Sequence, residues 1–354
     1  MTNSSRHIEE LLEYIVGKGA SDLHISVGVP PVMRIDGALQ HIPGEPVTPE
    51  QAEGLARELL VGDNSDGGER ERRFRETGEA DFAYSLANKA RFRVNVYRQR
   101  GQVSCAVRYI PVQIPSFDQL GLPPVIASLA HKPQGLILVT GPTGSGKTST
   151  LAAMINHINK TRRKHIVTLE DPIEFVYSHE QALVHQREIG MDTSSFTTAL
   201  RAALRQDPDV VLIGEMRDLE TISSAITMAE TGHLVLATLH TTDAPQSVDR
   251  IIDAFPAHQQ SQVRSQLATV LAAVISQRLL PKRGGGRVCA TEILINNPAV
   301  ANLIRTEKNH QIKSVLQTSR AQGMHTLEMC IRDLLGRGII DSATAGEYLS
   351  EANH

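Results

Sequence analysis

Residues 136–148 read LILVTGPTGSGKT, and this stretch decides the fold. Its first five residues are a short apolar run of the kind that forms a buried strand. The next eight, GPTGSGKT (141–148), match the phosphate-binding pattern GxxxxGK[ST]. Apolar residues then recur at helical spacing from Leu151 to Ile158. The stretch therefore predicts a strand, a loop and a helix in the order that a P-loop requires.

The loop itself predicts a site for ATP. Its glycines let backbone amides curl around phosphate oxygens where a Cβ would obstruct them, and the helix N-terminus adds positive potential. Lys147 is expected to reach the β- and γ-phosphates, and the hydroxyl of Thr148 is expected to bind Mg²⁺. A site that binds nucleotide without hydrolysing it is the alternative. The predicted contacts are Gly141, Pro142, Thr143, Gly144, Ser145, Gly146, Lys147 and Thr148.

Further apolar runs follow the loop and alternate with helical patterns. They are IVTL (166–169), VVLI (210–213) and LVLAT (234–238). Such alternation predicts crossover units and a mainly parallel sheet covered on both faces, which is an α/β core. After Pro281 and the turn RGGGR, one more strand, VCATEIL, leads into helical segments, so a helical C-terminal subdomain is expected.

The chain before the loop has a different character. A helical pattern over 8–16 precedes short alternating segments, and two alternating runs, 90–100 and 102–110, predict paired strands of an α+β domain. The polar stretch 62–79 is expected to be a solvated loop and helix end. IPVQIPSFDQLGLPP (110–124) has four prolines and predicts an extended connector. We therefore expect an N-terminal domain over 1–110, a linker over 111–124 and an ATPase domain with a helical C-terminal subdomain over 125–354.

Composition sets limits on partners and compartment. The formal charge of -3, from 36 basic and 39 acidic residues, demands neither nucleic acid nor an anionic membrane as partner. The 3 cysteines form no CxxC pair, which argues against a disulfide framework or a zinc ribbon and fits a reducing compartment. No apolar run approaches the roughly 18 residues that span a bilayer. A soluble, cytoplasmic protein is expected.

The strand in DVVLIGEMRD (209–218) lacks the aspartate that holds magnesium in most P-loop motors, because Gly214 and then Glu215 follow it. Glu170 and Asp171 follow the strand IVTL directly. Ligands of an open parallel sheet collect at the carboxyl ends of its strands. We therefore predict that Glu170 holds Mg²⁺, directly or through water, and that Glu215 polarises the attacking water. A turn or helix-capping role before Pro172 is the alternative for both Glu170 and Asp171.

Two histidines bracket the strand in TGHLVLATLHTTDAP (231–245). His233 precedes the strand and His240 follows it. We predict that both report the nucleotide state or donate to phosphate; packing or capping is the alternative.

Together these motifs resemble a known family. The chain carries GASDLHISVGVPPVMRIDG, ARFRVN, GPTGSGKT, LEDPIEF, QREIG, ALRQDPDVVLIGEMRD, AETGHLVLATLHTT and NLIR. In these stretches it is similar to the secretion-superfamily ATPases and, within them, to the type IV pilus retraction ATPases. The resemblance implies that Glu170 is the Asp-box acid, Glu215 the glutamate of an atypical Walker B motif, and His233 and His240 the His-box histidines.

The resemblance also implies an architecture. It predicts a PAS-like N-terminal domain joined by a flexible linker to a RecA-like P-loop ATPase domain, assembled as a hexameric ring. Arg93 and Arg108 match arginines that close over the nucleotide phosphates, a task that suits the planar, always charged guanidinium. Exposure on a polar strand face is their alternative reading.

AVANLIR (299–305) resembles a motif, AIRNLIR, tied to retraction in the family. Ala301 stands where the family has arginine, and Asn302 to Arg305 are retained. An amphipathic helix that packs Leu303 and Ile304 would explain the same residues without a special role.

The function implied is an ATP-hydrolysing motor that powers pilus retraction, and so twitching motility, by disassembling the pilus fibre. The implied partners are further copies of this chain, an inner-membrane pilus platform protein (PilC-like) and, as a further option, a second retraction ATPase; the implied location is the cytoplasmic face of the membrane. An accessory retraction paralogue is one alternative. A pilus-assembly or type II secretion ATPase is another, although that group carries paired CxxC motifs, which this sequence lacks. A low-turnover nucleotide-binding regulator and a nucleic-acid motor are the others, the last without an evident basic, aromatic stretch.

Overall fold

Two units make up the chain in the computed structural model, Met1–Gln113 and Ile114–His354. Each is described by itself. Residues 63–66 of the predicted polar stretch and residues 111–112 of the predicted linker lie outside the described residues. The structure describes residues 7–35, 37–62, 67–86, 90–110 and 113–351.

The first unit is an antiparallel sheet of six strands in the order β3-β2-β1-β6-β5-β4, with three helices. The predicted alternation in β5 is confirmed, because Phe92, Val94 and Val96 are buried. Much of the polar stretch, expected to be a solvated loop and helix end, forms a helix, α3. The elements are α1 (Ile8–Gly17), β1 (Asp22–Ile25), β2 (Val32–Ile35), β3 (Ala38–His41), α2 (Pro49–Val61), α3 (Gly67–Thr77), β4 (Glu79–Leu86), β5 (Ala90–Gln99) and β6 (Gln102–Ile110).

The second unit is built on a seven-stranded sheet in the order β13-β12-β7-β11-β10-β8-β9. All neighbours are parallel except β12 and β13, which form an antiparallel pair. The mainly parallel sheet predicted from the sequence is therefore confirmed, although β9 and β12 were not foreseen. The strands are β7 (Gly135–Thr140), β8 (His165–Glu170), β9 (Leu183–Glu188), β10 (Val210–Ile213), β11 (Leu234–Leu239), β12 (Leu271–Pro281) and β13 (Arg287–Ile295).

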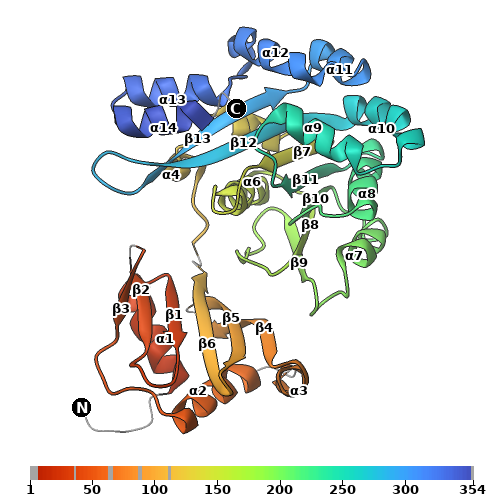
Figure 1. Ribbon diagram of the computed structural model, residues 1–354. Helices are drawn as coiled ribbons and strands as arrows, with labels where there is room; N and C mark the ends of the chain where they lie inside the picture. The colour runs from red at the N-terminus through yellow and green to blue at the C-terminus, as the bar shows by residue number, and fades with distance from the viewer. Residues whose placement is uncertain (1–6, 36, 63–66, 87–89, 111–112, 352–354) are drawn as a thin grey trace. The chain divides into compact units, whose positions relative to one another are not determined.

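Helices cover both faces of this sheet (Figure 1). One face packs against α4 (Phe117–Leu120), α5 (Val125–Ala130) and α6 (Lys147–Thr161). The other packs against α7 (Phe196–Ala203), α8 (Leu219–Glu230), α9 (Ala244–Asp253), α10 (Ala257–Val270), α11 (Pro298–Arg305) and α12 (Ile312–Thr318). Two last helices, α13 (Leu327–Gly336) and α14 (Ser342–Glu351), pack on β12 and β13 through a small core of their own. No helix in the described ranges has both the length and the apolar character needed to cross a bilayer.

Candidate nucleotide site

The carboxyl ends of four parallel strands meet at one edge of the sheet. The last residue of β7, Thr140, pairs with Leu239 of β11, and Ile213 of β10 pairs with both Leu169 of β8 and Ala237 of β11. The segments that follow these strands therefore share this edge. They are the loop 141–146 after β7, Glu170 at the end of β8, Gly214 and Glu215 after β10, and His240 after β11.

The loop after β7 is shaped for an anion. Gly141 has φ +140, and a Cβ there would lie 2.5 Å from the carbonyl oxygen of Gln277 and 2.6 Å from Ser145 Oγ, so only glycine fits. Ser145 Oγ is buried and has no hydrogen-bond partner among the described residues. Lys147 Nζ donates to the carbonyl oxygens of Gly141 (2.7 Å) and Pro142 (3.1 Å), so the lysine lies over the loop. These features fit a phosphate group, because the loop leaves a space that a side chain would fill and offers it an unsatisfied hydroxyl and a cation.

Lys147 is surrounded by charge. Burial lowers the pKa of its ammonium, the carboxylates of Glu215 and Glu174 act to raise it, and the guanidinium of Arg278 acts to lower it further. Lys147 therefore shares one electrostatic environment with the ends of β8 and β10 and with β12. The sequence interpretation left Glu174 aside and did not include Arg278.

Two side chains contact the Glu215 carboxylate, one from the segment after β10 and one from the residue after β11. Its Oε2 lies 2.7 Å from Nη2 of Arg217, and its Oε1 lies 3.0 Å from Nε2 of His240. The bond from Arg217 lowers the pKa of the Glu215 carboxyl, the charges of Arg217 and His240 lower it further, and partial burial opposes them. Glu215 is therefore ionised at neutral pH and able to accept a proton or orient a water molecule. Arg217 was missed in the sequence, where only its place two residues after Glu215 signals it.

Glu170 is buried, with an exposed fraction of 7%. Its Oε1 accepts hydrogen bonds from Thr168 Oγ1 (2.6 Å) and Gln186 Nε2 (3.2 Å). Burial raises the pKa of the carboxyl, and the neighbouring charge of Glu174 adds to that, while the hydrogen bonds oppose it. Glu170 and the hydroxyl of Thr148, in the first turn of α6, are oxygen donors of the kind that Mg²⁺ prefers, so this donor set fits the metal.

Gly214 allows the ends of β8 and β10 to lie close together. Its N–H donates to the carbonyl oxygen of Leu169 at 2.8 Å. A Cβ at position 214 would lie 3.2 Å from that oxygen and 3.5 Å from the Cα of Glu170. The side chain of an aspartate at this position would crowd the neighbouring strand.

The two predicted histidines lie at opposite ends of β11. His240 contacts Glu215, as described above. His233 precedes the strand, where its Nδ1 lies 2.9 Å from the carbonyl oxygen of Met228, at the far edge of the sheet. Six residues of strand separate them, about 20 Å. His240 therefore lies at the edge that carries the phosphate loop and His233 at the opposite end of β11, so the predicted role of His233 in reporting the nucleotide state stays a prediction.

Arg93 and Arg108 belong to the first unit, so their approach to the phosphates stays a prediction. They are direct partners across β5 and β6, and both are exposed on the same face. Like charges in this arrangement repel each other. Nε of Arg108 lies 2.9 Å from Asp22 Oδ1, which offsets part of that repulsion. The structure places the two predicted arginines directly opposite each other on neighbouring strands.

The segment AVANLIR forms α11. Val300, Ala301 and Ile304 are buried, whereas Asn302 and Arg305 are exposed. Ala301 has an exposed fraction of 8% and packs in the main core, so the side chain that replaces the family's arginine is a small apolar one in a closed position. Its effect on retraction stays a prediction.

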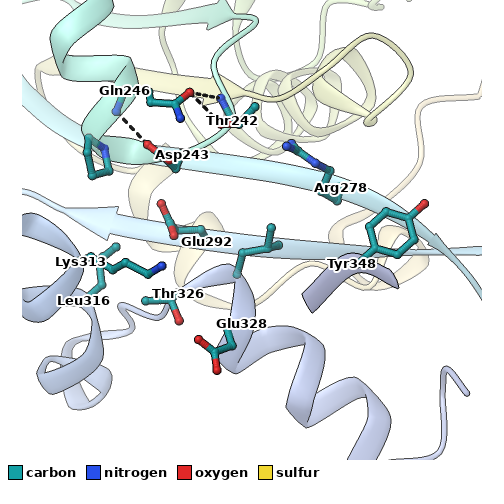
Figure 2. Close-up of a pocket in the computed structure, with 12 residues that line it drawn as sticks. Thr242, Asp243, Gln246, Arg278, Glu292, Lys313, Leu316, Thr326, Glu328 and Tyr348 are labelled. Atoms are coloured by element: carbon teal, nitrogen blue, oxygen red, sulfur yellow. Dashed lines mark hydrogen bonds between the residues drawn. The ribbon is translucent and has the colours of Figure 1, made fainter. Parts of the chain in front are cut away.

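A pocket lies beside β12 and β13 and is lined by Asp243, Arg278 and Glu292 among other residues. Figure 2 shows Glu292 between Asp243 on one side and Lys313 and Thr326 on the other. Glu292 Oε1 accepts a hydrogen bond from the N–H of Ala244 (2.9 Å), at the start of α9, and the carboxylate also accepts from the N–H of Leu327, at the start of α13. Glu292 therefore joins the N-termini of two helices. Burial and the charge of Asp243 raise its pKa to about 7, against the two backbone bonds and Lys313.

Comparison with known proteins gives a consistent result. Residues 2–285 match the family described as type II/IV secretion system protein. The chain is 47% identical over 340 residues to the type IV pilus retraction ATPase PilT of Pseudomonas aeruginosa, covering 96% of this chain and 97% of that protein. It is 41% identical over 346 residues to the type IV pilus ATPase PilU of the same organism, covering 98% and 89%.

Among solved structures, the chain is similar to the crystal structure of the pilus retraction motor PilT with bound ADP. The TM-score is 0.90 at 47% identity, covering 97% of this chain and 96% of that one. The expected fold class, a RecA-like α/β core with an additional N-terminal part and a helical C-terminal part, is confirmed.

Proposed function

The chain belongs to the type II/IV secretion system protein family, and from that premise we propose that it is an ATP-hydrolysing motor that powers type IV pilus retraction. The observation that carries the proposal is the convergence of the phosphate loop, Lys147 and the doubly held Glu215 at one edge of the sheet. The high identity to PilT over almost the whole chain supports the direction of the motor. Retraction of the fibre accounts for twitching motility.

In this proposal each residue has one task. The amides of 141–146 and Lys147 bind the phosphates of ATP. Thr148 and Glu170 would hold Mg²⁺, Glu170 directly or through water, and the ion would neutralise negative charge on the phosphates. Glu215 orients the attacking water and takes its proton, and His240 keeps the Glu215 carboxylate in place. ADP and phosphate are the products.

We also propose a role for the arginine pair of the first unit. We assign to Arg93 and Arg108 the task of binding the phosphates when the first unit, which we take to be the PAS-like domain, closes over nucleotide. Their adjacency across β5 and β6 supports this role. His233 is not given a task at the phosphates of its own chain.

The motor acts as a homohexameric ring in the cytoplasm, at the inner face of the cell membrane. It transmits force to an inner-membrane platform protein (PilC-like), and nucleic acid is not a partner. The 41% identity to PilU supports a second candidate, an accessory retraction ATPase that works beside another motor.

The test is deletion of the gene in its host, with complementation by the wild-type gene and by an E215Q gene. Excess surface pili with lost twitching, restored by wild type and not by E215Q, is the expected result. Bald cells would overturn the proposal in favour of an assembly motor. Restoration by E215Q would favour the accessory role, because an accessory subunit need not hydrolyse ATP itself.

A further inference from the structure

Gln186 makes contacts on both sides of Glu170. It lies on β9 directly opposite Thr168 of β8, so Thr168, Glu170 and Gln186 share one face of the sheet. Gln186 Nε2 donates to Glu170 Oε1 (3.2 Å) and to the carbonyl oxygen of Phe175 (2.7 Å). Its Oε1 accepts from the N–H of Tyr177 (2.9 Å). The side-chain amide of Gln186 therefore connects the Glu170 carboxylate to the backbone of Phe175 and Tyr177, in the segment after β8.

The orientation of this amide is fixed by its partners. Glu170 Oε1 and the carbonyl oxygen of Phe175 are both acceptors, whereas the N–H of Tyr177 is a donor. A flipped amide would set oxygen against two oxygens and NH₂ against an N–H. Gln186 can satisfy these groups in one orientation, so it holds the Glu170 carboxylate in a defined direction.

Glu188, two residues after Gln186 on the same face of β9, also contacts the segment after β8. Glu188 is buried, and its Oε2 accepts from the N–H of Ile173 at 3.0 Å. The segment after β8 is thus held to β9 at Ile173 by Glu188 and at Phe175 and Tyr177 by Gln186. Gln186 in addition donates a hydrogen bond to Glu170 itself.

We propose that Gln186 is a positioning residue for the magnesium-side acid, acting through Glu170 and not through the nucleotide. The inference rests on the proposed function, in which Glu170 serves the metal. A ligand carboxylate that receives a directed hydrogen bond is held ready for the metal, and loss of such a bond weakens metal binding by roughly 10–100-fold in other sites. Thr168, the second donor to the same oxygen, is part of the same support.

The experiment measures Mn²⁺ binding to the full-length protein loaded with ADP, by the electron paramagnetic resonance signal of free Mn²⁺. Mn²⁺ is used because it takes the oxygen ligands that suit Mg²⁺. Q186M keeps the bulk of the side chain and removes its polar atoms, and Q186E keeps an acceptor for Tyr177 and removes the donor to Glu170. Both are expected to weaken Mn²⁺ binding about 10-fold or more, while ADP affinity in EDTA stays at the wild-type value.

Asn159 offers a matched control. It is buried, its Nδ2 donates to the carbonyl oxygen of Ser178 (2.7 Å) and its Oδ1 accepts from the N–H of Glu180 (3.2 Å), so it holds the far end of the same segment. N159A should lower the urea midpoint of unfolding without changing Mn²⁺ affinity. If Q186M also lowers that midpoint and leaves Mn²⁺ affinity unchanged, Gln186 supports the fold alone and the inference is wrong.

E170Q separates this inference from the proposed function. The inference expects E170Q to weaken Mn²⁺ binding at least as much as Q186M. Weak binding in E170Q with normal binding in Q186M and Q186E would overturn the positioning role alone. Normal binding in E170Q would overturn both the positioning role and the metal role assigned to Glu170, whereas absence of ATP hydrolysis in the wild type would overturn the motor itself.

Discussion

Replacing Glu292 with glutamine should stabilise the protein, and the gain should grow as the pH rises. Glu292 has an exposed fraction of 5%, and burial raises its pKa from the ordinary 4.5 to about 7. A raised carboxyl pKa means that the folded chain binds the proton more tightly than the unfolded chain. The contribution of Glu292 to the unfolding free energy is therefore highest below about pH 4.5, falls as the pH rises towards 7, and levels off above it.

The size of the effect follows from that interval. Raising the pKa from 4.5 to about 7 opposes folding by about 3 kcal/mol at high pH, at about 1.4 kcal/mol per unit. Glutamine at position 292 removes this cost, and its one carbonyl oxygen can accept from the N–H of Ala244 or of Leu327. The hydrogen bond of the other N–H is weakened, which costs about 1 kcal/mol. The net gain is about 2 kcal/mol near pH 8.5 and close to zero near pH 5.

The assay is urea unfolding of the full-length protein near pH 5 and near pH 8.5, for wild type, E292Q and the exposed control E347Q. The difference in unfolding free energy between E292Q and wild type should rise by roughly 2 kcal/mol between the two conditions, because only Glu292 is removed. E347Q should show no such rise. An equal difference at both values of pH would refute the argument that a buried charge at Glu292 opposes folding.

Three further variants test the site. G141A should weaken binding of a fluorescent ADP about 10-fold or more, because its Cβ would lie 2.5 Å from the carbonyl oxygen of Gln277; wild-type affinity would contradict the cradle. R217M removes the hydrogen bond and the charge that lower the pKa of Glu215, so the acid limb of the pH profile of kcat/KM should move to higher pH, and an unmoved limb would show that Arg217 does not act on Glu215. G214A should lower the unfolding free energy by about 1–3 kcal/mol, since its Cβ would lie 3.2 Å from a backbone oxygen of β8; an unchanged urea midpoint would disprove the close contact.

Much of the ATPase core was predictable because its signals are local. The loop pattern sits between a strand and a helix in a single stretch, and the acids Glu170 and Glu215 each follow directly on an apolar run. Strand β9 escaped because it is an edge strand in which Leu183 and His185 are exposed, so it has no continuous apolar run. Strand β12 escaped because it begins directly at the end of α10, without a turn residue to mark the change.

The missed residues depend on contacts that no local pattern contains. The order of His233, strand and His240 in the sequence already places the two histidines at opposite ends of β11. The contact of Arg217 with Glu215 depends on the rotamer of Arg217. The contact of Gln186 with Glu170 depends on the pairing of β9 with β8. The roles of Arg217 and Gln186 could not be predicted from the sequence because they depend on tertiary contacts.

The most direct test of the account is steady-state phosphate release by the purified full-length protein with ATP and Mg²⁺, compared between wild type and E215Q. Binding of a fluorescent ADP is measured on the same samples. The account predicts that wild type hydrolyses ATP, and that E215Q binds nucleotide equally well but is slower by about 100-fold or more, the range typical of a lost general base. Turnover in E215Q at the wild-type rate, or none in the wild type, would contradict it.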